Sequence, residues 1–122
     1  MLENNFYTIH DLQAESGSIK AELIIDPQHH IFEGHFPGQP VTPGVCMLQM
    51  IKEVMEKVVG SRTQLLKADE IKFLAIIDPR NNNQVTASMN YTVEEDKVKL
   101  NAALSKGDLT HFKFKGSFRL QP

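Results

Sequence analysis

Apolar and polar residues alternate with a period of two along much of this chain, which is the pattern of β-strands that bury one face. The clearest such strands are predicted at residues 19–25, 85–93, 98–104 and 112–120. Asp26-Pro27 ends the first of them, and short polar links between the last three favour hairpins. A less regular strand is predicted from Leu65 to Leu74, and Phe6 to Ile9 favours an added edge strand.

One segment has helical periodicity instead, from about Pro43 to Val59, and Gly60 follows it as a stop signal. At about 100° per residue, its apolar side chains fill roughly half of the circumference. These positions are Met47, Leu48, Met50, Ile51, Val54, Met55, Val58 and Val59. A helix this apolar is largely enclosed. The pattern therefore predicts an α+β fold in which a curved antiparallel sheet wraps around one central helix.

Size and composition narrow the class of protein. With 122 residues, the chain is expected to form a single domain spanning residues 1–122. A net charge of −2 without a run of lysine and arginine argues against nucleic acid as a partner. Cys46 is the one cysteine, which suits a reducing compartment. No secretory signal and no apolar stretch of about 20 residues is found, so a cytoplasmic protein without a membrane span is expected.

The segment from Gly34 to Met47 is the most constrained part of the sequence. It holds three glycines, three prolines and one histidine, His35, directly before the apolar helical pattern. Proline restricts the backbone, and glycine permits conformations closed to other residues. The composition predicts a rigid loop that positions one imidazole, which is typical of a functional site.

This loop resembles the signature of the hotdog-fold dehydratases that act on 3-hydroxyacyl chains carried by acyl carrier protein. In that family, a glycine-flanked His-Phe-Pro-Gly precedes Pro-Val-x-Pro-Gly-Val, which opens the central helix. Here residues 35–38 and 40–45 read His-Phe-Pro-Gly and Pro-Val-Thr-Pro-Gly-Val at the same spacing. Ile71-Lys72-Phe73 fits the strand after the helix, and Pro79 fits a turn beyond it. The resemblance covers nearly the whole chain and implies the hotdog fold.

The resemblance also implies a mechanism and a set of site residues. Dehydration removes a proton from C2, expels hydroxide from C3 and places negative charge on the thioester oxygen. His35 would be the base, because neutral imidazole accepts a proton near pH 7. The Val41 carbonyl would orient that ring. The Gly44 amide would bind the thioester oxygen, a role that also suits an unpaired amide at the start of a helix.

The sequence departs from the family where the mechanism needs an acid. The family carries Glu or Asp fourteen residues after the histidine, and this chain has Gln49 there. Glutamine can orient a hydroxyl or a water, but it cannot protonate a leaving group at neutral pH. Imidazolium at His35 could return its proton to the C3 oxygen. Alternatively Glu53, one helical turn further, could act through a water.

Three functions stay open on the sequence alone. The first is a homodimeric dehydratase or trans-2-enoyl hydratase in fatty acid or related lipid or polyene biosynthesis, and the retained His35 loop favours it. The second is a non-catalytic acyl-binding or partner subunit of a hotdog heterodimer, which Gln49 favours. The third is an acyl thioesterase, which would depend on Glu53. The expected partners are acyl carrier protein and a second hotdog subunit, and the only expected prosthetic group is the carrier's own phosphopantetheine.

Two further clusters of polar residues have simpler interpretations. His29 and His30 match no helical or Cys/His metal motif, so no metal site is expected and the two histidines are predicted to cap or decorate a turn. Gln49, Glu53 and Glu56 are predicted to form a solvated helix face. The resemblance implies instead that this face meets the partner subunit, where each active site is completed across a homodimer and Gln49 from the other subunit orients the hydroxyl or water.

Overall fold

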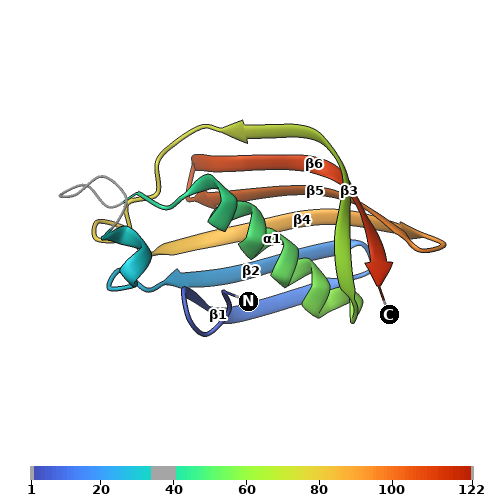
Figure 1. The fold of residues 1–122 in the computed structure, drawn as a ribbon, viewed down its shortest axis with the longest axis horizontal. Coiled ribbons are helices and arrows are strands. Elements are labelled where there is room, and N and C mark those ends of the chain that lie inside the picture. Colours follow the sequence, from blue (N-terminus) through green and yellow to red (C-terminus); the bar gives the residue numbers. More distant parts are fainter. Residues whose placement is uncertain (1, 34–40, 122) are drawn as a thin grey trace.

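The structure is a computed structural model, and it describes residues 2–33 and 41–121 of the chain. Within these residues, six strands form one sheet and one α-helix lies against a face of that sheet (Figure 1). The elements are β1 (Tyr7–Glu15), β2 (Ser18–Ile25), the 3-10 turn η1 (His30–Phe32), α1 (Gly44–Val59), β3 (Arg62–Phe73), β4 (Gln84–Glu94), β5 (Lys97–Lys106) and β6 (Leu109–Gln121). This architecture confirms the predicted α+β hotdog fold.

The strands follow the order β1-β2-β4-β5-β6-β3, and each is antiparallel to its neighbours. The register places apolar residues opposite one another on the buried face, for example Leu23 opposite Val85 and Met89 opposite Ala102. The alternation read from the sequence is therefore confirmed for the central strands. Val93 departs from it with 47% exposure, because the end of β4 runs past the buried face.

The helix α1 has the predicted limits. Pro43 is its N-cap residue, and Gly60 ends it with φ of 76°, a left-handed conformation that glycine adopts without a steric penalty. One side is buried as expected. The other side differs from the prediction, because Glu53 is only 1% exposed. No helix in the described residues is long and apolar enough to span a membrane.

The strand β3 forms one edge of the sheet and is the irregular strand that the sequence predicted. Its pairing with β6 is interrupted by two register shifts. Apolar side chains on β3 and just after it are exposed, namely Leu65, Leu66, Ile71, Phe73, Leu74 and Ile76. The opposite edge, β1, exposes mainly polar residues. The β3 edge is thus the apolar edge of the described chain.

Candidate functional site

An apolar groove of about 540 Å³ lies where α1 begins. Residues 41–45 line one side, and Phe73 and Ile76 line the other. The groove is therefore formed by the entry to the helix and by the exit from β3, which are far apart in the sequence.

The backbone of Gly44 comes very close to the Phe73 ring. A Cβ atom built on Gly44 would lie 2.4 Å from Cε1 of Phe73, so a larger residue would displace that ring. The amides of Cys46 and Met47 donate to the Pro43 carbonyl, whereas no described residue accepts from the Gly44 amide. An unpaired amide at a helix start attracts negative charge. This geometry suits a developing oxyanion, the role that the resemblance implied for Gly44.

The strand end opposite Gly44 is held in place by backbone bonds. The His111 carbonyl accepts from the amides of Leu74 and Ala75, at 2.9 and 3.2 Å. The Nδ1 atom of the His111 ring lies 3.3 Å from the carbonyl oxygen of Ala75. On the other side, the Thr42 amide donates to the Ile77 carbonyl at 3.0 Å. The segment from Leu74 to Ile77 is therefore bonded to β6 through His111 and to the opposite wall of the groove through Thr42.

A second polar centre lies further along α1, around the buried carboxylate of Glu53. This carboxylate accepts hydrogen bonds from the amides of Leu2 and Glu3, both at 2.8 Å, and from the Tyr7 hydroxyl at 3.0 Å. The side-chain nitrogen of Gln49 donates a fourth bond, at 2.8 Å. Gln49 and Glu53 also border a hollow of about 660 Å³. The carboxylate thus ties the N-terminal segment and Gln49 to one point on the helix.

The hydrogen bonds decide the charge of this carboxyl. Burial disfavours the ionised form of Glu53, but the bonds from Leu2, Gln49, Glu3 and Tyr7 outweigh it and lower the pKa of Glu53 below the ordinary value of 4.5. Burial and the neighbouring Glu53 raise the pKa of Tyr7 above its ordinary value of 10.0. At neutral pH the pair is therefore a carboxylate and a neutral phenol.

Stability at acid pH depends on this lowered pKa. The native state holds Glu53 ionised more firmly than the unfolded chain does, so its contribution is present above the unfolded pKa and is lost as pH falls through the folded pKa. We expect the denaturation midpoint of Glu53→Gln to change less than that of the wild type between about pH 5 and pH 3. Urea titrations at a series of pH values measure this midpoint. The same dependence of the midpoint on pH in both proteins would contradict the expectation.

The structure separates the residues that the sequence singled out. His35 lies outside the described residues. Val41 and Gly44 line the groove together, whereas Gln49 and Glu53 border the hollow on the polar side of α1. For Glu53, the predicted solvated face is wrong, because the N-terminal segment covers it.

Sequence reasoning missed the part that Tyr7 and the first amides play. Nothing in the local pattern marks a tyrosine at the start of an edge strand as the partner of a carboxylate 46 residues away. His29 behaves as predicted, since its Nδ1 accepts from the Ile31 amide and caps the turn η1. Among the described residues, no group of three histidine, cysteine, aspartate or glutamate side chains could hold a metal ion.

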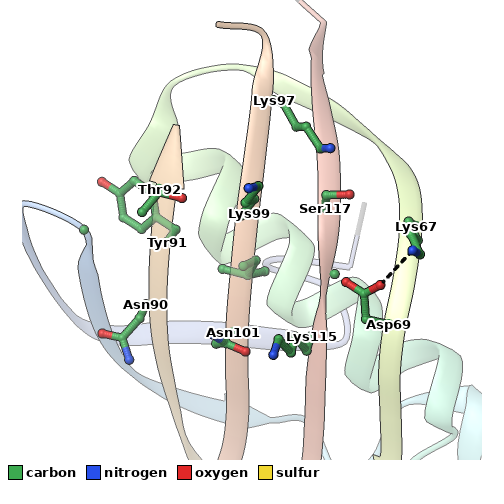
Figure 2. Close-up of a pocket in the computed structure, with 13 residues that line it drawn as sticks. Lys67, Asp69, Asn90, Tyr91, Thr92, Lys97, Lys99, Asn101, Lys115 and Ser117 are labelled. Carbon is green, nitrogen blue, oxygen red and sulfur yellow. Dashed lines mark ion pairs between the residues drawn. The ribbon is translucent and has the colours of Figure 1, made fainter. Parts of the chain in front are cut away.

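Another hollow, of about 580 Å³, lies on the sheet face away from α1 (Figure 2). Its charged lining consists of Lys67, Asp69, Lys97, Lys99 and Lys115, and Lys67 pairs with Asp69 at 3.3 Å. It has no imidazole, and its one carboxylate among the described lining residues is already paired. This surface carries positive charge but no acid–base pair, so it is not a candidate active site.

This chain is similar to a protein family, to a sequence relative and to two solved structures. Residues 11–116 match the family described as ApeI-like, ApeI dehydratase. The 3-hydroxyacyl-acyl-carrier-protein dehydratase FabZ of Fusobacterium nucleatum is 28% identical over 102 residues, which are 80% of this chain and 68% of that protein. The solved dehydratase heterocomplex ApeI:P from Xenorhabdus doucetiae matches with a TM-score of 0.73 at 20% identity, over 91% of this chain and 96% of that one. A hypothetical thioesterase with coenzyme A from Streptococcus pneumoniae TIGR4 matches with a TM-score of 0.69 at 10% identity, over 94% and 85%. The two structural matches establish a shared fold.

Proposed function

This chain belongs to the ApeI-like dehydratase family, and from that premise we propose that it interconverts 3-hydroxyacyl and trans-2-enoyl thioesters carried on acyl carrier protein. The observation that carries the proposal is the Gly44 amide, which has no acceptor among the described residues and lies beside an apolar groove, nine positions after His35 in the sequence. An apolar groove of this size accommodates an acyl chain, and the amide accommodates the thioester oxygen.

In the proposed reaction, His35 removes a proton from C2, and the Gly44 amide binds the thioester oxygen as it gains negative charge. The electrons of the broken C2–H bond form the C2=C3 double bond as the C3–O bond breaks. The departing hydroxyl takes the proton from His35 and leaves as water. The Val41 carbonyl orients the imidazole. Gln49 of the second subunit binds the C3 hydroxyl, so that each active site is completed across the dimer. It transfers no proton, since an amide is not an acid at neutral pH.

Glu53 carries no proton in this proposal. Its carboxylate already accepts from Leu2, Glu3, Tyr7 and Gln49, and these bonds hold it ionised. A group whose pKa is lowered is poorly suited to protonate a leaving group. The route through Glu53 is therefore weaker than the return of the proton from His35.

A second candidate is a partner subunit without activity of its own, and Gln49 is the observation that favours it. Such a subunit would keep the fold and bind a catalytically complete relative. This candidate differs from the first in its preferred assembly, because it would form a heterodimer in preference to a homodimer. The ApeI:P structure is described as a heterocomplex, which makes that assembly a reasonable alternative.

Either candidate requires a second subunit, and we propose that it docks along the β3 edge. This edge exposes Leu66 and Ile71 at 40% and 42%, and an unpaired strand edge readily adds another strand. We expect Leu66→Lys/Ile71→Lys to yield monomers in analytical ultracentrifugation. The matched control is Val93→Lys/Leu109→Lys, which charges two similarly exposed apolar residues that lie outside β3, on β4 and β6. Dimers that persist in the β3 variant would place the interface elsewhere.

The direct test of function is the addition of purified protein to a short trans-2-enoyl-acyl carrier protein. Loss of the enoyl absorbance without release of thiol is the expected result. Release of thiol would establish a thioesterase instead. If neither signal changes, the partner-subunit candidate replaces the first, and co-purification with a second hotdog protein becomes the decisive measurement.

A further inference from the structure

The Glu53 centre raises a question that the proposed reaction leaves open, namely which end of the Gln49 side chain meets the substrate. A glutamine amide has one end that donates and one end that accepts hydrogen bonds. The nitrogen end binds a ligand atom that accepts a hydrogen bond, and the oxygen end binds one that donates. The contacts of Glu53 decide between them.

Three of the four groups around the carboxylate donate hydrogen bonds to it from the N-terminal part of the chain. These are the amides of Leu2 and Glu3 and the hydroxyl of Tyr7, all within 3.0 Å. They hold Glu53 in its ionised form, and an ionised carboxylate only accepts hydrogen bonds. The Gln49 atom that lies 2.8 Å from it must therefore be the nitrogen.

The opposite end of the same amide is the carbonyl oxygen. No described residue donates a hydrogen bond to the Gln49 carbonyl oxygen, and Gln49 is half-buried at the border of a hollow. Among the described residues, Glu53 is thus the single side chain that binds the Gln49 amide, and it binds the nitrogen.

We propose that Glu53 is a positioning residue that holds the Gln49 nitrogen and thereby presents the Gln49 carbonyl oxygen to a substrate bound in the groove of the second subunit. This inference rests on the proposed function. Gln49 then accepts a hydrogen bond from the C3 hydroxyl during dehydration, or from the attacking water during hydration. The accepted bond orients the C3–O bond while His35 supplies the proton, so no proton passes through Gln49 or Glu53.

The arrangement also explains why a carboxylate at position 49 conflicts with this protein's own Glu53. Gln49→Glu would place two carboxyl groups one helical turn apart, at the distance of the present hydrogen bond of 2.8 Å. Two such groups cannot both be ionised without strong repulsion. Introducing the family's acid therefore requires the exchange Gln49→Glu/Glu53→Gln, in which the amide at position 53 donates to the new carboxylate.

The test is a double-mutant cycle in the enoyl hydration assay. Glu53→Gln leaves an amide that can present either end to Gln49, so we expect kcat to fall about tenfold with little change in KM. In a Gln49→Leu background the same substitution should have no further effect, because the group it positions is absent. A tenfold loss in both backgrounds would overturn the inference and leave Glu53 a merely structural role.

A second measurement does not depend on turnover. The side-chain amide protons of Gln49, assigned by their loss in Gln49→Leu, should include one that is shifted downfield and exchanges slowly with solvent. Glu53→Gln should abolish this signature. The matched control Glu56→Gln should leave it intact, since Glu56 is bonded to Thr63 and has no hydrogen bond to Gln49.

The two measurements separate the two proposals. A wild-type protein without hydration activity, but with the Gln49 signature, would refute the proposed function and leave the placement of the amide standing. A signature that persists in Glu53→Gln would overturn the positioning role, whatever the activity.

Discussion

His35→Ala is expected to lower the rate of enoyl hydration by about 10²–10⁴-fold while the protein stays folded. The size of the effect follows from the absence of a carboxylic acid at position 49. In the proposed reaction one imidazole both accepts the C2 proton and returns it to the C3 oxygen. Its removal therefore takes away the base and the acid together. Initial rates from enoyl absorbance, with circular dichroism to verify the fold, provide the measurement.

The control for this experiment is His10→Ala, which removes an exposed imidazole from β1. It should hydrate the substrate at the wild-type rate. If His35→Ala were as active as this control, the imidazole would have no part in the reaction. The groove at Gly44 would then be a binding site without the proposed chemistry.

Glu53→Ala is expected to lower the free energy of unfolding by about 3 kcal/mol, which is large for one substitution. The carboxylate is 1% exposed and accepts from Leu2, Glu3, Tyr7 and Gln49. Alanine would leave these donors without a partner and would release the N-terminal segment from α1. Urea denaturation at pH 7 measures the loss.

A matched comparison is Glu56→Ala, on the same helix. Glu56 is half-buried and accepts two bonds, both from Thr63. Its loss should cost about 1 kcal/mol. Tyr7→Phe removes one of the four donors to Glu53 and should also lower the free energy of unfolding less than Glu53→Ala does. Equal losses for Glu53→Ala and Glu56→Ala would contradict the central position given to Glu53.

Much of the fold could be predicted from periodicity, because the pattern of apolar residues shows which side chains are buried. The alternation in β2, β4, β5 and β6 and the apolar side of α1 each report which side chains leave water. Caps are also local, so Gly60 could be read as the end of the helix. The limits of β1 were harder to predict, because an edge strand with one exposed face has a weak apolar pattern.

One part of the candidate site could be predicted from local sequence, and another part depends on the tertiary fold. The groove at Gly44 could be anticipated, since a helix start and its unpaired amides are encoded by neighbouring residues. The wall that Phe73 contributes was less evident, because it depends on how the irregular pairing of β3 with β6 places the end of β3 beside the start of α1.

The sequence by itself determined the α+β hotdog architecture and the position of α1, because these depend on periodicity and on a contiguous motif. Only the tertiary structure decided the state of Glu53. Its ionisation and its bond to Gln49 arise from Leu2, Glu3 and Tyr7, which folding brings to the helix from about 50 residues away. A local pattern cannot reveal whether a glutamate on a polar helix face meets water or buried donors, and here that difference decides which end of the Gln49 amide binds Glu53.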